Sequence, residues 1–279
     1  MRYTAIFPGN CMKATVIIVT YNKPKYLKVT LDAYRNQTCM DFDIIIADDG
    51  STEETQLLIE AEQKDHPVAI KHVWHEDNGF QKCRILNKSI KAAKQSDYLI
   101  FSDDDCIPFP DFIEKHRQNA KQNQFLSCGA MRLPDNLTEA IFKQGHTTFN
   151  FHWLNQNGLA DRLKYKRFFW PQWSRILLDK IVPIAKTFNG GNASAFKNQI
   201  IKVGGFDERM AYGGEDVELG LRLTHIGMKA KRLRHQIRAL HLEHGRPYVN
   251  DEMVESNRKI RQSTIDSKRT YSSHHIDFD

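Results

Sequence analysis

The stretch Tyr98-Leu-Ile-Phe-Ser-Asp-Asp-Asp105 is a short, mainly apolar run that ends in three consecutive aspartates. Such a run is typical of a parallel strand buried on both faces of a sheet. Residues 14–20 and 41–47 have the same character, and the second run leads directly into Asp48 and Asp49. In open parallel sheets the ligand crevice lies beyond the carboxyl ends of the strands. Both acidic clusters are therefore predicted to face one site.

The segments between these strands have the character of helices. Residues 24–36 open with a proline, which the first turn of a helix tolerates, and residues 53–64 and 82–93 carry apolar side chains at helical spacing. A further strand is predicted over residues 70–74. The alternation over residues 14–130 predicts an α/β fold, with a mixed, mainly parallel sheet flanked by helices.

The second half of the chain is less regular. Residues 131–186 are rich in aromatic residues, and the belt at 168–173 suits either core packing or a platform for a sugar. A glycine-rich stretch follows, and a helix is predicted over residues 217–226. We expect a single domain in four parts, namely an extension (1–12), two lobes that share a cleft (13–130 and 131–255) and a polar surface helix or loose tail (256–279).

The composition is that of an ordinary globular chain, with 41% hydrophobic and 27% charged residues. No apolar run approaches the ~20 residues of a membrane span, and no secretory signal is visible. The five cysteines show no Cys-x-x-Cys pair, so reduced thiols are expected. We therefore expect a cytoplasmic protein whose net charge of +6 suits a polyanionic partner: nucleic acid, anionic lipid or a phosphorylated substrate.

Several motifs follow one another at predicted strand ends and helix starts: Val19-Thr-Tyr-Asn22, Ala47-Asp-Asp-Gly-Ser-Thr52, Gly79-Phe-Gln-Lys-Cys-Arg-Ile-Leu-Asn87 and Phe101-Ser-Asp-Asp-Asp105. Together they resemble the inverting GT-A glycosyltransferases of family 2. Two later motifs, Phe206-Asp-Glu208 and Tyr212-Gly-Gly-Glu-Asp-Val-Glu218, resemble the C-terminal region of β-1,4-galactosyltransferases and bacterial chondroitin-type polymerases. The resemblance covers about residues 13–248.

This resemblance implies a GT-A fold and a metal-dependent, inverting transfer of a sugar from a nucleotide sugar, expected to be UDP-linked. The acceptor would be a hydroxyl of a saccharide or a lipid-linked molecule, in bacterial surface polysaccharide or lipopolysaccharide synthesis. Residues 13–130 would hold the nucleotide sugar, and residues 131–255 would hold the acceptor and the catalytic base. The Gln-x-x-Arg-Trp segment of processive, membrane-embedded synthases is not visible, so a non-processive enzyme is expected.

The resemblance also implies where the nucleotide would bind. Thr20 and Tyr21 would line the uracil and ribose pocket, and one carboxylate of the pair Asp48 and Asp49 would accept from the uracil N–H. Arg84 would face the diphosphate or the ribose, because a guanidinium offers two parallel donors. Lys82 is a second candidate for this contact, and a plain surface lysine is its other interpretation.

Strand-end carboxylates two residues apart can hold Mg²⁺ or Mn²⁺. By the resemblance, Asp105 would be the firmer metal ligand, Asp103 would lie on the ribose side, and Asp104 would point elsewhere. Relatives supply a histidine at about this place to complete the metal shell, and the resemblance favours His241, with His244 as the alternative. A histidine that only bonds a carbonyl remains open for either position.

Glu215 and Asp216 begin the predicted helix, where the helix dipole stabilises acidic side chains. A purely structural role is therefore open. The same dipole keeps a carboxylate ionised, as a general base must be. The resemblance implies that Asp216 is the base and that Glu215 binds an acceptor hydroxyl.

Two other functions share features with this sequence. A nucleotidyltransferase also uses strand-end aspartates and a metal. It needs a basic, glycine-rich loop after the first strand to bind a triphosphate, and this sequence has Tyr21-Asn-Lys-Pro24 there. A basic nucleic-acid or membrane-binding module would use a set of tail residues, namely Arg258, Lys259, Arg261, Lys268 and Arg269. No stacked-aromatic RNA motif accompanies them, so nucleic acid is not expected as a partner. Peripheral contact with an anionic membrane remains compatible with the transferase.

Overall fold

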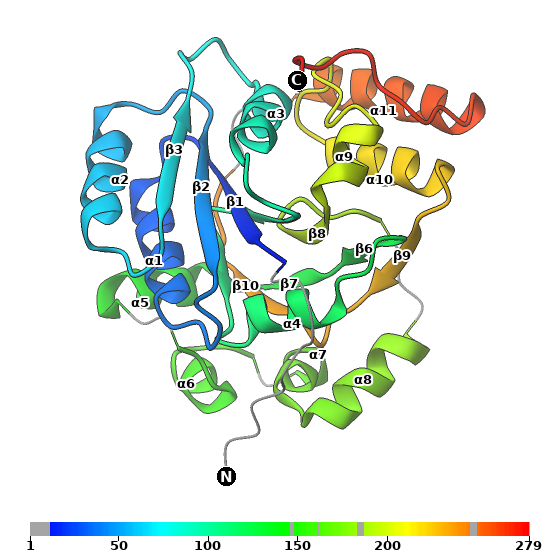
Figure 1. Ribbon diagram of the computed structural model, residues 1–279. Coiled ribbons are helices and arrows are strands. Elements are labelled where there is room, and N and C mark those ends of the chain that lie inside the picture. The colour runs from blue at the N-terminus through cyan, green and yellow to red at the C-terminus, as the bar shows by residue number, and fades with distance from the viewer. Residues whose placement is uncertain (1–11, 146–147, 161, 183–186, 246–249, 279) are drawn as a thin grey trace.

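The computed structural model describes residues 12–145, 148–160, 162–182, 187–245 and 250–278 (Figure 1). Its main sheet has the strand order β3-β2-β1-β4-β8-β6-β9. The strands are β1 (Ala14–Thr20), β2 (Phe42–Asp48), β3 (Ile70–Trp74), β4 (Tyr98–Asp103), β6 (Gln124–Ser127), β8 (Asn192–Phe196) and β9 (Lys229–Arg232). Only β8 runs antiparallel to its neighbours, which confirms the predicted mixed, mainly parallel sheet.

The register of the sheet brings the acidic strand ends together. Thr20 at the end of β1 is paired with Asp48 of β2, and Val19 is paired with Asp103 of β4. Because these strands are parallel, their carboxyl ends lie at one edge of the sheet. Successive side chains of β1 point to opposite faces of the sheet, and each face is covered by a hydrophobic core. Ile17 packs into the core on one face and Ile18 into the core on the other, so the strand is apolar over most of its length.

Helices cover both faces of this sheet (Figure 1). The helices α1 (Pro24–Tyr34) and α2 (Glu53–Asp65) pack with Ile18, whereas α3 (Lys82–Ala92) packs on the opposite face. These three helices begin where the sequence predicts them. Thr52 stands at the N-cap of α2, and its backbone N and hydroxyl donate to Asn22 Oδ1.

A small second sheet carries the histidine region. It contains β5 (Cys106–Pro108), β10 (Arg238–His241) and β7 (Gly129–Arg132), in the order β5-β10-β7. His241 is paired with Cys106, so it lies beside the aspartates that precede β5. The helix α4 (Phe112–Asn119) follows β5.

The region 131–186, which was predicted to be irregular, contains several helices: α5 (Asp135–Gln144), α6 (Phe151–Gln156), α7 (Leu163–Lys166), a 3₁₀ turn (Arg167–Phe169) and α8 (Gln172–Ile181). That prediction was wrong: apolar residues recur at helical spacing in α5 (Leu137, Ile141) and in α8 (Leu177, Ile181), while many aromatic residues of the region pack into a third core. Phe168 belongs to this core, whereas Trp173 is exposed.

The C-terminal part contains α9 (Lys197–Lys202), α10 (Glu215–His225) and α11 (Asp251–Asp266). The predicted boundaries at residues 131 and 256 fall within β7 and α11, and the predicted extension lies almost wholly outside the described residues. The tail helix is not loose. Asn257 of α11 accepts from Ala211 N at 3.1 Å and donates to the carbonyls of Ala211 and Gly213. It therefore holds the loop that precedes α10.

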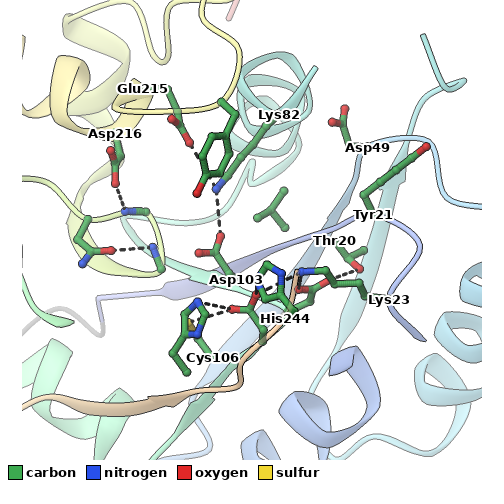
Figure 2. A pocket seen from close by; sticks show the side chains of 18 of the residues that line it. Thr20, Tyr21, Lys23, Asp49, Lys82, Asp103, Cys106, Glu215, Asp216 and His244 are labelled. Carbon is green, nitrogen blue, oxygen red and sulfur yellow. Dashed lines mark hydrogen bonds and ion pairs between the residues drawn. The ribbon is translucent and has the colours of Figure 1, made fainter. Parts of the chain in front are cut away.

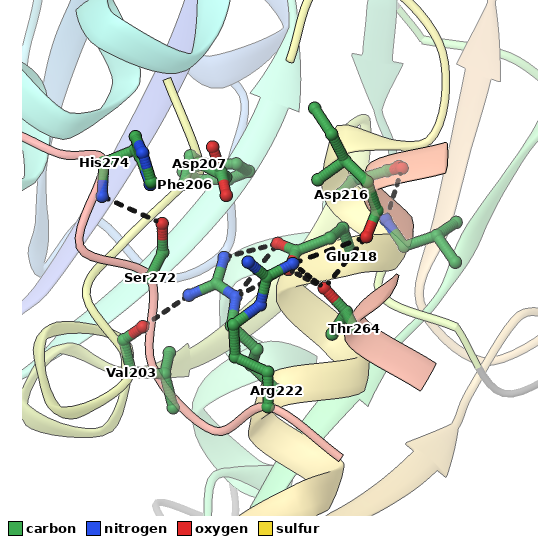
Figure 3. A network of polar contacts seen from close by, with 12 residues as sticks. Val203, Phe206, Asp207, Asp216, Glu218, Arg222, Thr264, Ser272 and His274 are labelled. Atoms are coloured by element: carbon green, nitrogen blue, oxygen red, sulfur yellow. Dashed lines mark hydrogen bonds and ion pairs between the residues drawn. The ribbon is translucent and has the colours of Figure 1, made fainter. Parts of the chain in front are cut away.

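A buried ion pair within α10 is hydrogen-bonded to α11 (Figure 3). Arg222 and Glu218 are fully buried, and Arg222 Nη2 lies 2.6 Å from Glu218 Oε2. Thr264 of α11 donates its hydroxyl to Glu218 Oε1 at 2.8 Å, and Arg222 Nη1 donates to the carbonyl of Val203. Each charge therefore has its own partners inside the core.

We expect Glu218→Ala to lower the free energy of unfolding by about 3–5 kcal/mol, because it leaves the Arg222 guanidinium buried without its counter-charge. Urea unfolding followed by circular dichroism measures this. The control is Glu255→Ala, which removes the exposed partner of Arg258 and should leave the midpoint unchanged. Equal midpoints for the two variants would contradict the assigned role of the buried pair.

Candidate active site

A cavity of about 580 Å³ opens at the carboxyl ends of β1 and β4. Figure 2 shows the side chains that converge on it from the main sheet, the small sheet and α10. It is lined by most of the residues that the sequence singled out, namely Thr20, Tyr21, Asp49, Lys82, Asp103, Asp104, Asp105, Glu215, Asp216, His241 and His244. Asp48 and Arg84 do not line it.

The two histidines meet at Asp105. His244 Nε2 lies 2.8 Å from Asp105 Oδ2, and His241 Nε2 lies 3.6 Å from Asp105 Oδ1. Burial alone would raise the pKa of Asp105, but the hydrogen bond from His244 and the charge of His241 hold it below its usual value. The same hydrogen bond raises the pKa of His244, whereas burial lowers that of His241.

This group has the donor chemistry of a divalent-cation site. One ligand atom each of Asp105, His241 and His244 lies within 4.8 Å of the others, and Asp103, Asp105 and Cys106 form a second such group. Imidazole and carboxylate together suit Mn²⁺ and similar ions. The Nδ1 atom of His241 is buried and has no hydrogen-bond partner among the described residues. One nitrogen of His241, of the kind that binds metal ions, is therefore without a hydrogen-bond partner among the described residues of this polar site.

The sequence did not single out Lys23, which stands at the N-cap of α1. Its Nζ lies 3.4 Å from Asp105 Oδ2 and 3.9 Å from Asp104 Oδ1. It places a positive charge beside the aspartates on the side opposite Lys82. Its signal in the sequence was its position directly after Val19-Thr-Tyr-Asn22.

Asp104 points back toward β1. It accepts from the Thr20 hydroxyl at 2.7 Å, and its backbone carbonyl accepts from the Thr30 hydroxyl at 2.6 Å. Burial and the neighbouring Asp105 raise the pKa of Asp104 to about 7. The middle aspartate thus ties β1 and α1 to the end of β4.

The Asp48–Asp49 pair divides in two directions. Asp48 is fully buried, and its carboxylate binds Ser51 N at 2.8 Å and His72 Nε2 at 2.9 Å. Asp49 lines the cavity and binds His75 Nε2 at 2.7 Å and Gln81 N at 3.0 Å. Neither histidine belongs to a motif that predicts this contact, although each lies in or just after β3, the strand beside β2.

Lys82 and Arg84 point in different directions, since residues two apart on a helix are rotated by about 200°. Arg84 is exposed. Lys82 Nζ lies 3.1 Å from Asp103 Oδ1 and 3.5 Å from Glu215 Oε1. Burial alone would lower the pKa of Lys82, but the charges of Asp103, Glu215 and Asp216 raise it well above its usual value.

Asp216 lies across the cavity from this aspartate group, in the first turn of α10. Its Oδ2 accepts from Gly190 N at 2.8 Å (Figure 2), and its Oδ1 accepts from Val217 N at 2.7 Å. Burial and the neighbouring Glu215 raise the pKa of Asp216 to about 6. Glu215 itself accepts from Gly213 N at 3.0 Å.

The glycine loop between the two acidic groups is tightly fitted. A Cβ at Gly191 would lie 2.8 Å from Asp103 Oδ2 and 3.3 Å from Cys106 Sγ. A Cβ at Gly190 would meet nothing closer than 3.6 Å. The space beside Asp103 therefore requires glycine at position 191 but not at position 190. The glycine-rich composition of this loop is visible in the sequence but does not by itself predict a role.

Comparison with solved structures identifies the class of fold. A mannosyltransferase from Pyrobaculum calidifontis, solved with GDP-Man and Mn²⁺, aligns with a TM-score of 0.57 and 18% identity over 84% of this chain and 58% of its own. S. aureus TarS residues 1–349, solved with UDP-GlcNAc, aligns with a TM-score of 0.58 and 15% identity over 89% of this chain and 65% of its own. The fold is that of the GT-A glycosyltransferases.

The particular family follows from the sequence model of glycosyl transferase family 2, which matches residues 15–203. The chain belongs to this family and is a glycosyltransferase. A second family model, described as the N-terminal domain of galactosyltransferase, matches residues 181–245. The nucleotidyltransferase and binding-module alternatives are therefore set aside.

Two curated relatives are polysaccharide synthases. Chondroitin synthase of Escherichia coli is 26% identical over 230 residues, which are 76% of this chain and 32% of that protein. Hyaluronan synthase of Pasteurella multocida is 29% identical over 239 residues, which are 76% of this chain and 23% of that protein. The chain thus spans about a third or less of their length. Among the described residues no helix has the length and apolar character to cross a bilayer.

We expect Gly191→Ala to lower the affinity for Mn²⁺ by about tenfold, because the added methyl group displaces the Asp103 carboxylate from the aspartate group. Isothermal titration calorimetry measures this. Gly190→Ala is the matched control, since its methyl group has room, and it should bind Mn²⁺ as the wild type does. Wild-type affinity in Gly191→Ala would show that Asp103 has no part in holding the ion.

Proposed function

We propose that this chain transfers a sugar from a UDP-sugar to a hydroxyl of a saccharide or lipid-linked acceptor, in one displacement that inverts the anomeric centre. The observation that carries the proposal is the arrangement of two separate acidic groups around one cavity. Asp103 and Asp105 with the histidines form one side, Asp216 forms another, and Lys82 lies between them. An inverting displacement needs a leaving-group site and a base on opposite faces of the sugar.

The nucleotide would lie along the carboxyl ends of β1 and β2. Asp49 lines the cavity there, with one oxygen bound to His75 and the other to Gln81 N. Such a fixed carboxylate suits the N–H group of a uracil ring. Tyr21 is exposed beside it, and its hydroxyl donates to Asp77 at 2.8 Å. The Lys82 ammonium, rather than Arg84, would then face the diphosphate.

Mn²⁺ or Mg²⁺ would be held by Asp105 and Asp103 together with a histidine, and it would supply charge neutralisation for the departing UDP. His244 suits this role better than His241. Its Nδ1 lies 2.8 Å from the carbonyl of Gly245, which can only accept, so Nδ1 carries a hydrogen. Nε2, which here donates to Asp105 Oδ2, is therefore the nitrogen that would give up its proton and bind the ion, with Nδ1 held by the carbonyl as is typical of histidine ligands.

Asp216 would remove the proton from the acceptor hydroxyl. The Gly190 N–H holds one of its oxygens, and the start of α10 favours its negative charge. A pKa of about 6 leaves the carboxylate mostly ionised at neutral pH and still basic enough to accept a proton. Glu215, its neighbour, would bind a second acceptor hydroxyl. The names of the synthase relatives favour a saccharide as the acceptor.

Two variants should separate binding from chemistry. Asp105→Ala is expected to abolish Mn²⁺-dependent UDP binding, because the site rests on few protein ligands. Asp216→Asn is expected to keep this binding and to lower kcat by about 10²–10⁴-fold, the usual contribution of a positioned base. Calorimetry with UDP and Mn²⁺, and turnover in a screen of UDP- and GDP-sugars, measure the two effects.

The outcomes that would contradict the proposal are distinct. UDP binding in Asp105→Ala that persists in EDTA would remove Asp105 from the metal site. Near wild-type turnover by Asp216→Asn would remove Asp216 from the mechanism. A product with retained anomeric configuration, determined by NMR, would discard the single displacement.

The pH profile should report Asp216. Since the base must be ionised, kcat is expected to fall as the pH drops through about 6. Glu215 raises this pKa and Lys82 lowers it, so Glu215→Gln should move the acid limb to lower pH. Stopped assays between about pH 5 and 8 measure the limb. An acid limb at the same pH in Glu215→Gln would mean that another group controls it.

A further inference from the structure

The helix α8 presents a row of apolar side chains to solvent. Trp173 is 71% exposed, Leu177 49% and Ile181 62%. These positions are four residues apart, so they form one stripe along the helix. The opposite face packs inward through Ser174, Arg175 and Leu178. The helix is thus apolar on a face that its own fold does not cover.

Neighbouring residues extend this stripe. Leu163 on α7 is 62% exposed and Trp170 is 37% exposed. We call the five side chains Leu163, Trp170, Trp173, Leu177 and Ile181 the α7–α8 face. Soluble surfaces seldom gather so many large apolar groups on one short segment unless a partner covers them. Figure 1 shows α7 and α8 along the edge of the molecule that lies away from α3, α10 and α11.

The charge around this face is strongly one-sided. Its exposed basic residues are Arg162, Lys164, Lys166 and Lys180. Among the described residues 162–182 the one acidic residue is Asp179, which is turned inward: its Oδ1 lies 2.8 Å from His235 Nδ1, and its Oδ2 accepts from Gln236 Nε2 at 3.0 Å. The surface therefore offers positive charge and apolar groups together.

We propose that the α7–α8 face docks the enzyme on an anionic phospholipid surface. Tryptophan favours the boundary between lipid headgroups and acyl chains, and an amphipathic helix with a basic rim lies in the plane of that boundary. The basic side chains supply the attraction to anionic headgroups. A second copy of the chain is a poorer occupant, because a two-fold interface would bring each rim of like charge against its counterpart.

This face is tied to the wall of the cavity but is not part of it. Arg175 of α8 donates to the carbonyl of His235 at 3.1 Å, and Arg238 of β10 donates to the carbonyl of Phe168 at 3.2 Å. β10 also carries His241, so a docked α8 would hold the cavity at a fixed place relative to the membrane. None of the α7–α8 face residues lines the cavity, so changes there should leave nucleotide binding intact.

The test is sedimentation of the whole chain with vesicles. Wild-type protein should bind vesicles of phosphatidylcholine with phosphatidylglycerol and should not bind phosphatidylcholine alone. Trp173→Ser should lower the partition coefficient about tenfold through the loss of buried apolar area. Lys164→Gln combined with Lys180→Gln should lower it about tenfold or more, and added salt should weaken wild-type binding.

Matched controls come from α11, where Ile265 is 44% exposed and Lys259 is also exposed. Ile265→Ser and Lys259→Gln should bind vesicles as the wild type does. Mn²⁺-dependent UDP binding, measured on every variant, keeps this test separate from that of the transferase mechanism. The proposal is overturned if the wild type does not bind anionic vesicles, if Trp173→Ser binds them as strongly as the wild type, or if only the α11 variants lose binding. Two results together would assign the face to a second copy of the chain. The wild type would form a dimer in vesicle-free buffer that Trp173→Ser dissociates, and it would not bind vesicles.

Discussion

Three consecutive carboxylates at the end of one buried strand are the constraint around which this structure is built. Charges so close together repel one another, and burial raises the free energy of each ionised form. Basic side chains from distant parts of the chain offset this repulsion. Lys82 from α3 meets Asp103, while Lys23 from α1 and His244 from beyond β10 meet Asp105. The strand end thus dictates where three other segments must lie.

Much of the first half could be predicted from the sequence because its signals are local. Residues 14–20 and 70–74 are strands as predicted, and α1, α2 and α3 begin at the predicted residues. A β-branched run between polar turns has few alternative structures. The convergence of the strand ends followed from the parallel arrangement of the sheet. The roles of the individual site residues remain predictions.

The contacts that depend on three-dimensional packing could not be predicted in this way. Lys23 reaches the aspartates because α1 leaves β1 at a particular angle, and His75 meets Asp49 because β3 pairs with β2. Which of Lys82 and Arg84 faces the cavity depends on the rotation of α3 about its own axis, and this rotation is set by packing. The helices of the region 131–186 were missed because its many aromatic residues make the composition resemble an irregular segment, although α5 and α8 keep helical spacing and most of the aromatic residues pack into one core.

The attachment of the C-terminal helix has a consequence for how this molecule loses activity. Asn257 binds the backbone at Ala211 and Gly213, and Gly214, whose φ is +85°, lies against the side chain of Arg261. The local stability of α11 and the position of Asp216 are therefore thermodynamically coupled. Detachment of this helix alone, a partial opening well short of global unfolding, would release the loop that leads into Asp216. Mild heat or a fusion at the C-terminus would then displace the proposed base Asp216 from a distance, while the central sheet stays folded.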